Sequence, residues 1–217
     1  TVLGTIFTVF AASFPAYAFT RNEYWGRKFF YRFVVVTMYF SAGLIPLFLT
    51  YRTIGIYNTF WVYIIPGIVT PFNLILCKTY IESLPASLEE SAEIDGAGYL
   101  VRYFRLILPL SKPILATVSV FSAVGQWNNW MDTVLYTKDK SLQTLQYVLY
   151  RYLNEANTLA EIAREDPSAM NADLATQLSP LTIKYTISIV TILPILLVYP
   201  FFQKYFVKGI MIGAVKG

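Results

Sequence analysis

The chain has 217 residues, of which 56% are hydrophobic and 14% are charged, and its formal net charge is +4. This balance is too apolar for an ordinary soluble domain and is typical of a membrane protein. The absence of histidine and the presence of one cysteine, Cys77, exclude an intrachain disulfide, a histidine metal site and a histidine-dependent catalytic triad. Cys77 lies in an apolar run, where a buried small side chain is expected.

Five apolar runs reach the length of about 20 residues that crosses a bilayer. The spans are predicted near Val2–Phe19, Phe33–Thr50, Ile56–Tyr80, Ile114–Tyr136 and Leu181–Phe206. Prolines interrupt several of them, and neighbouring helices can satisfy the carbonyls that a proline frees. Any one run could be a buried helix of a soluble protein, but five leave too little polar sequence to cover such a core. The sequence therefore predicts an all-α, polytopic transmembrane bundle.

The distribution of lysine and arginine indicates which connections face the cytoplasm. Basic residues gather in 21–32, in 78–112 and in 204–216, which fall on one side of an alternating topology. The long connection 137–180 carries more acidic than basic side chains. Short basic connections face the cytoplasm. We therefore expect segment 82–113 and the tail 204–217 inside, and the loop 137–180 outside.

Segment 82–113 predicts two short cytoplasmic helices. Pro85 is tolerated in the first turn of one helix, and Gly96 suits the left-handed position that ends it. A second helix is expected from Tyr99 to Leu108, with Pro109 ending it. Its apolar side chains would share one face: Leu100, Phe104 and Ile107. The alternative is an amphipathic segment on the lipid headgroups, but anionic lipid would repel its acidic first half.

The outside loop contains a second amphipathic pattern. Leucine and tyrosine recur at intervals of three and four residues from Leu142, which predicts a helix over 142–153 with further turns before Pro167. An apolar stripe outside the bilayer must cover the spans, the headgroups or another protein.

Two motifs resemble a known family. The sequence from Glu90 resembles the E-A-A-x-x-x-G-A, then L-P, loop of ABC importer permeases, with Ser91 in place of the usual alanine. The matching positions are Glu90, Ala92, Asp95, Gly96, Ala97, Phe104, Leu108, Pro109 and Pro113. The ending Q-K-Y-F-V-K-G, then G-A-V-K-G, resembles that of carbohydrate-importer permeases of the maltose-transporter class.

This resemblance implies a type I ABC importer permease fold, with 1–217 forming a single transmembrane domain. The family usually has six spans, so its first span would precede Thr1. The chain would be a transport subunit of a prokaryotic inner membrane, binding no metal or cofactor itself, with its C-terminus in the cytoplasm. Its partners would be a second, non-identical permease subunit, two ATPase subunits that bind ATP and Mg, and an extracytoplasmic solute-binding protein. The chain has no phosphate-binding G-x-x-x-x-G-K-[ST] loop of its own.

The resemblance also assigns residues. Segment 82–113 would contact the ATPase through Glu90, Ala92, Asp95, Gly96, Ala97, Phe104 and Pro109. The tail would reach the ATPase through Lys208, Gly209, Gly213 and Lys216. Glycines weaken a regular helix, so we expect an extended tail; the alternative is a frayed end that only anchors the last span.

Four residues in or near the spans are candidates for the substrate pathway: Asn73, Gln126, Trp127 and Asn128. Amides can bond sugar hydroxyls, and an aromatic ring can stack on the C–H face of a sugar. The alternatives are hydrogen bonds between helices for the amides and interfacial anchoring for Trp127 and Trp130.

The sequence therefore predicts the permease of an ATP-driven carbohydrate importer, with an oligosaccharide as the expected cargo. An importer of amino acids or peptides remains the alternative. A membrane-embedded enzyme is disfavoured, because no predicted span carries a cluster of ionisable groups.

Overall fold

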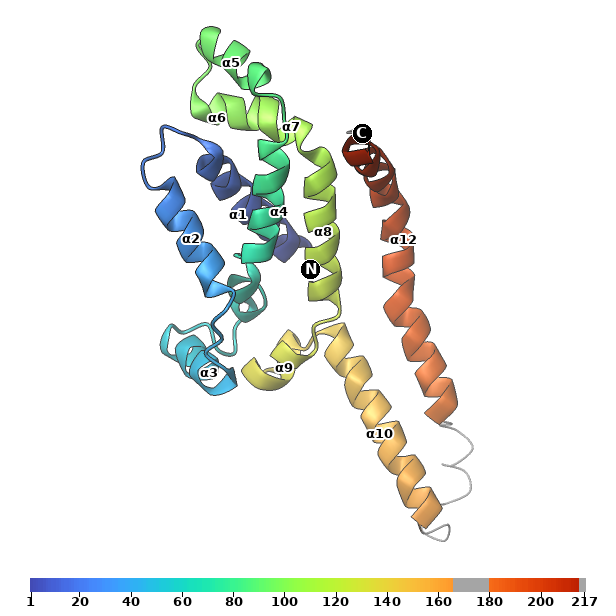
Figure 1. Ribbon diagram of the computed structural model, residues 1–217. Coiled ribbons are helices and arrows are strands. Elements are labelled where there is room, and N and C mark those ends of the chain that lie inside the picture. The colour runs from blue at the N-terminus through green and yellow to red at the C-terminus, as the bar shows by residue number, and fades with distance from the viewer. Residues whose placement is uncertain (166–179, 215–217) are drawn as a thin grey trace.

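The computed structural model describes residues 1–165 and 180–214, and every regular element in these ranges is helical (Figure 1). The elements are α1 (Val2–Thr20), α2 (Arg27–Thr37), α3 (Leu44–Thr53), η1 (Phe60–Tyr63), η2 (Ile65–Gly67), α4 (Pro71–Glu82), α5 (Ala86–Ile94), α6 (Tyr99–Arg102), η3 (Tyr103–Ile107), α7 (Leu108–Leu110), α8 (Lys112–Trp127), α9 (Met131–Tyr136), η4 (Lys140–Leu142), α10 (Leu145–Glu165) and α12 (Pro180–Ala214). The all-α prediction is confirmed.

Two described helices are long and apolar enough to cross a membrane on their own. They are α1 and the stretch Thr182–Phe201 of α12, which match the first and last predicted spans. Two further candidates are bent pairs: Phe60–Gly67 with α4, at 46°, and Tyr99–Leu110 with α8, at 78°. The bend before α4 accounts for the third predicted span, which Pro66 and Pro71 interrupt.

The second predicted span, Phe33–Thr50, is wrong as a single helix. Residues 38–43 are not helical, and they separate α2 from α3. Gly43 has φ 81°, which is left-handed, and Pro46 lies in the first turn of α3. A helix continuing through this point would bring the Pro46 ring against the Ala42 carbonyl, whereas proline is tolerated in a first turn.

The fourth predicted span, Ile114–Tyr136, is also divided. Helix α8 ends at Trp127, and α9 begins again at Met131. The Asn129 side chain accepts a hydrogen bond from the backbone N–H of Asp132 at 3.2 Å. This bond serves an N–H in the first turn of α9, so the polar sequence after Trp127 favours a new helix over continuation.

The main core lies where α1 packs against α4 and α8 (Figure 1). Its buried members are Ala12, Ala16, Tyr17, Leu74, Cys77, Ile81, Tyr103, Ile107 and Val118. Cys77 is fully buried, as predicted. A second cluster forms around Ile56, Val62 and Tyr136. Helix α12 lies along α10 in its first part and along α8 in its later part.

The molecule has two distinct ends. We call the end formed by α5–α7 and the last turns of α1 the hairpin end, and the end formed by residues 48–63 and 129–152 the aromatic end. The C-terminal part of α12 lies at the hairpin end, whereas α3 and α9 lie at the other (Figure 1). The topology prediction likewise places the tail and the hairpin on one side.

The extended tail predicted from its glycines is wrong as far as Ala214, because α12 continues through Gly209 and Gly213. Adding a residue to an existing helix avoids the cost of nucleation, which offsets the roughly 1 kcal/mol that each glycine costs. Lys216 lies outside the described residues.

Candidate functional site

The turn after α5 has the geometry that Gly96 was predicted to provide. Gly96 has φ 77°. Its N–H donates to the Glu93 carbonyl and the Ala97 N–H donates to the Ala92 carbonyl, both at 2.9 Å, which is the Schellman ending of a helix. A β-carbon on residue 96 would meet no atom within 4 Å. The need for glycine therefore comes from the backbone conformation.

The second helix of the hairpin differs from its prediction. Helical structure runs from Tyr99 to Leu110 and passes through Pro109, with a π-helical turn over Tyr103–Ile107. Pro109 has no N–H for the Arg105 carbonyl, and the wider turn takes the place of the α-turn that this proline would disrupt.

This turn also divides the expected apolar face. Leu100 and Phe104 are 60% and 50% exposed, whereas Ile107 is buried. Of these three side chains, only Ile107 belongs to the main core. Tyr103, which lies in the same turn, belongs to it as well.

Two adjacent glutamates on α5 have different surroundings. Glu89 accepts a hydrogen bond from the Tyr17 hydroxyl at 2.9 Å and forms an ion pair with Arg21. Glu90 is exposed and has no ion pair within the described ranges. Of these two carboxylates, Glu90 is therefore the one left to meet a partner protein.

Arg102 joins the two helices of the hairpin. Its Nη1 lies 3.1 Å from the Glu93 carboxylate, and its guanidinium lies over the Tyr99 ring, 4.5 Å from the centroid. Burial acts to lower the pKa of Arg102, but Tyr17, Glu93 and Glu89 hold it above its ordinary value. The cation is therefore retained in a buried position.

The hairpin exposes apolar side chains beside its acidic ones. We define its docking face as the exposed residues Glu90, Ile94, Asp95, Leu100 and Phe104. Ile94 is 86% exposed, which is unusual for isoleucine in a folded helix. Gly96 and Pro109 are also exposed, whereas Ala92 and Ala97 are half-buried. Such a face is typical of a protein-binding surface.

The four candidate pathway residues do not form one cluster. Gln126 and Trp127 line a hollow of 460 Å³ at the aromatic end, together with Tyr63, Asn129 and Gln143. Asn73 is buried in α4, and Asn128 is exposed after the end of α8. The structure therefore brings two of the four together.

Both tryptophans near the end of α8 have structural contacts. The Trp127 Nε1–H donates to the Thr191 carbonyl of α12 at 3.1 Å, and the Trp130 ring stacks on Tyr150 with centroids 3.9 Å apart. Gln126 packs so closely on α1 that a β-carbon at Gly4 would overlap its amide. Trp127 is therefore bonded to a neighbouring helix, a role that the sequence had suggested for the amides and not for the tryptophans.

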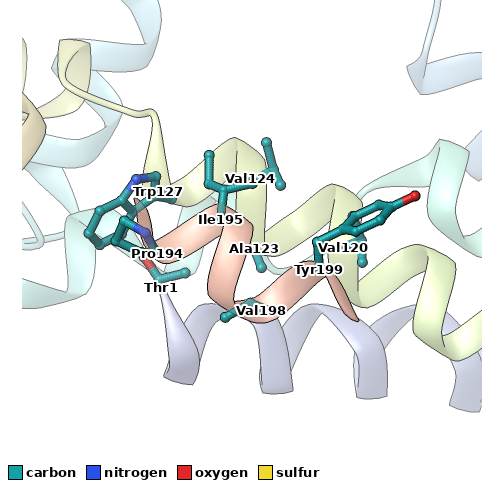
Figure 2. A pocket seen from close by; sticks show the side chains of 9 residues that line it. All are labelled: Thr1, Val120, Ala123, Val124, Trp127, Pro194, Ile195, Val198 and Tyr199. Atoms are coloured by element: carbon teal, nitrogen blue, oxygen red, sulfur yellow. The ribbon is translucent and has the colours of Figure 1, made fainter. Parts of the chain in front are cut away.

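A smaller cavity of 110 Å³ lies between α8 and α12 (Figure 2). Figure 2 shows Trp127 and Pro194 at one end of it and Tyr199 at the other, with valine, alanine and isoleucine side chains between them. Its apolar lining offers sugar hydroxyls few partners, so this cavity is a poor carbohydrate site.

Neutral polar groups hold the aromatic end together. Asn58 has φ 55°, and its Oδ1 accepts from the backbone N–H groups of Lys138 and Asp139 at 2.7 and 2.9 Å. The Tyr63 hydroxyl donates to the Leu142 carbonyl at 2.8 Å and lies 2.9 Å from the Thr133 hydroxyl. The predicted helix over 142–153 begins later, at Leu145, because Gln143 is extended. Leu145 and Tyr152, two members of its apolar stripe, are about half exposed.

Sequence reasoning missed the residues that join elements, namely Tyr17, Arg21, Asn58, Tyr63 and Glu89. A weak signal existed in and just after α1, where polar side chains recur at intervals of four residues, at Ser13, Tyr17 and Arg21.

The chain resembles known proteins over almost its whole length. Residues 4–212 match the family described as "Binding-protein-dependent transport system inner membrane component". The chain is 40% identical to the polygalacturonan/rhamnogalacturonan transport system permease protein YtcP of Bacillus subtilis, covering 100% of this chain and 74% of that protein. It is 28% identical to the arabinooligosaccharides transport system permease protein AraQ of Halalkalibacterium halodurans, covering 98% of this chain and 69% of that protein.

Among solved structures, the chain is similar to one in the crystal structure of a bacterial ABC transporter involved in the import of the acidic polysaccharide alginate. The TM-score is 0.77 and the sequence identity is 31%, over 94% of this chain and 72% of that chain.

Proposed function

Because the chain belongs to the family of binding-protein-dependent transport system inner membrane components, we propose that it moves a carbohydrate delivered by a solute-binding protein. The chain is a permease subunit of an ABC transporter and not an enzyme. One observation supports the cargo above others: the relative with 40% identity over the whole chain is a polygalacturonan/rhamnogalacturonan permease. The amino-acid or peptide alternative finds no support among the relatives named above.

The docking face is the surface that would meet the ATPase. An ATPase cleft would cover Ile94, Leu100 and Phe104, and a basic residue beside it would pair with Glu90. The ATPase subunits, not this chain, would bind ATP and Mg. A second, non-identical permease subunit would complete the membrane part of the complex.

The cargo is tested with the purified complex in proteoliposomes, supplied with its binding protein and ATP. Galacturonide and alginate oligosaccharides are compared with neutral arabino- and galacto-oligosaccharides, and with a dipeptide and an amino acid as non-sugar controls. We expect ATP-dependent uptake of at least one oligosaccharide. Uptake of only the non-sugar solutes would contradict the proposal.

The proposed orientation places residues 21–32, 82–113 and 204–217 in the cytoplasm. Single cysteines at Asn22, Ala97 and Asn157, in a Cys77→Ser background, are labelled from outside intact cells. We expect labelling at position 157 alone. Strong external labelling at position 97 would contradict this orientation.

The tail would act on the ATPase through Lys208, Gly209, Gly213 and Lys216. In support, α12 ends at the hairpin end of the molecule (Figure 1). Deleting residues 210–217 should lower uptake and uncouple ATPase activity from the loaded binding protein in an assembled complex. Wild-type uptake by the truncated complex would indicate an anchor only.

The substrate pathway would include Gln126 and Trp127, since both line the 460 Å³ hollow. Asn73 and Asn128 would contribute at other depths of the pathway. The amide of Gln126 and the ring of Trp127 offer the two kinds of contact that sugars use.

A further inference from the structure

Three polar side chains at the C-terminal end of α1 contact the hairpin end; two lie in the helix, and Arg21 follows it as the C-cap, with extended backbone. They are Ser13, Tyr17 and Arg21, which recur at intervals of four residues. The Ser13 hydroxyl lies 2.8 Å from the Tyr103 hydroxyl inside the core. Tyr17 and Arg21 both contact Glu89 of α5. All three side chains are thus bonded to hairpin elements.

Both carboxylate oxygens of Glu89 are bonded to side chains at the end of α1. The Tyr17 hydroxyl donates to Oε1, and the Arg21 guanidinium pairs with Oε2. The Glu89 and Arg21 side chains are 13% and 21% exposed, so water screens their pair only in part. The inward face of α5 is therefore bonded to α1, while Glu90 on the same helix faces outward.

Contacts within its own helix end fix the orientation of Arg21. Its Nε and Nη2 donate to the Thr20 hydroxyl at 3.1 and 2.9 Å, and its guanidinium lies over the Tyr17 ring at 4.9 Å. A guanidinium held in this way loses little further freedom when it pairs with a carboxylate.

The contacts of Glu89 link α5 to the rest of the molecule independently of its backbone connections. The backbone links α5 to α4 on one side and, through α6–α7, to α8 on the other. Glu89 adds a third connection, to a helix that is 72 residues away in sequence at Tyr17. Helix α1 in turn packs against both α4 and α8.

We propose that Glu89, Tyr17 and Arg21 are positioning residues that make α1 and α5 one moving unit, so that ATPase-driven displacement of α5 is passed directly to α1. This inference rests on the proposed function, because the displacement comes from the ATPase. The contact replaces no ligand and performs no chemistry. It holds α1 and α5 in a fixed relative position while the spans change their arrangement.

A covalent replacement of the ion pair tests the proposal. In a Cys77→Ser complex, Arg21→Cys with Glu89→Cys removes the contact, and a short bifunctional thiosulfonate reagent then joins the two positions. We expect uptake and binding-protein-stimulated ATPase activity to fall at least tenfold in the double variant. Crosslinking should restore both to within twofold, and a thiol reductant should remove them again.

Two results would overturn the proposal: full activity of the double variant without the crosslink, or a crosslinked complex that stays inactive. Co-purification of all subunits checks assembly. If the double variant does not assemble, Tyr17→Phe removes only the hydroxyl that bonds Glu89. The sugar moved per ATP hydrolysed should then fall about twofold, and an unchanged ratio would count against the linkage.

A matched control breaks an ion pair that joins no two elements. Glu82 pairs with Lys78 at 2.5 Å within α4, so Glu82→Gln in the same background should leave uptake unchanged. Failure of the unmodified complex to carry any oligosaccharide would refute the proposed function itself. Failure of the crosslink rescue in a transporting complex refutes only the linkage.

Discussion

At the hairpin end, ion pairs join α1 to α5 and α5 to α6, whereas at the aromatic end the described contacts between elements are neutral hydroxyl, amide and ring contacts. Both ends expose large apolar side chains, such as Ile94 at the hairpin end and Trp61 at the aromatic end, so the two ends differ in the charge of their contacts and not in apolar exposure. A partly buried charge pair loses much of its energy when its geometry is broken, so it favours joint movement of its two helices. Neutral contacts of the same number stabilise a fixed arrangement with less penalty for a small shift.

The largest effect on uptake is expected from Gly96→Val. A side chain at φ 77° costs about 1–2 kcal/mol, and a β-branched residue is among the worst for this conformation. That energy corresponds to roughly a tenfold loss of the docking-competent turn, and uptake should fall by about as much. Uptake is measured in proteoliposomes.

The control for this variant is Gly98→Ala. Gly98 has φ −68°, and a β-carbon there would meet no atom within 4 Å. Uptake should remain normal. Equal losses in both variants would mean that the turn geometry is not what the hairpin end requires.

Glu90→Lys should have the next largest effect. Glu90 is exposed, so the thermal unfolding midpoint of the permease should not change. The affinity for the ATPase should fall several-fold, because a like charge would face the basic partner residue. Binding of ATPase subunits to permease in nanodiscs measures this, and unchanged affinity would remove Glu90 from the docking face.

At the aromatic end, Asn58→Ala should affect stability more than uptake. It removes the acceptor of two backbone N–H groups and places alanine at φ 55°, for a loss of about 2 kcal/mol. Asn58→Gly keeps the backbone conformation accessible and so isolates the hydrogen bonds. We expect a lower unfolding midpoint for both variants and a smaller decrease for glycine. A tenfold loss of uptake in either variant would contradict the inference that the aromatic end serves stability rather than transport.

The smallest effect is expected from Tyr63→Phe. It leaves the Leu142 carbonyl and the Thr133 hydroxyl without this partner, at a cost of about 1 kcal/mol. Although Tyr63 lines the 460 Å³ hollow, its hydroxyl is already bonded within the protein, so uptake should change less than in any variant above. Tyr17→Phe deletes one hydroxyl at the hairpin end, so equal coupling ratios in the two phenylalanine variants would show that the ends do not differ in function.

Features with a local cause could be predicted from the sequence. The turn at Gly96 follows from glycine in a charged segment, and the helix start after Pro85 follows from the fixed φ of proline. The all-α fold and the family follow from apolar runs and from the motif at Glu90. In each case a few neighbouring residues determine the outcome.

Features that depend on distant contacts could not be predicted. The roles of Glu89 and Glu90 were obscure, because adjacent charges look alike until the fold brings Tyr17 and Arg21 to one of them. The π turn before Pro109 likewise shifted which apolar residues are buried. The break at residues 38–43 differs from these, because Gly43 and Pro46 mark it locally and the continuous apolar run from Phe33 to Thr50 outweighed them.

Because Gly4 is tightly packed against Gln126, α1 would tilt about its N-terminal end. A β-carbon at position 4 would overlap the Gln126 amide, so α1 and the Gln126 side chain of α8 are tightly packed there and have little room to slide. Arg21 lies about 25 Å farther along the helix axis, at 1.5 Å per residue. A tilt of about 10° around Gly4 would therefore carry the Arg21 end through roughly 4 Å, while the Gly4 end would hardly move. Small strokes of α5 would thus become changes in the angle of a span.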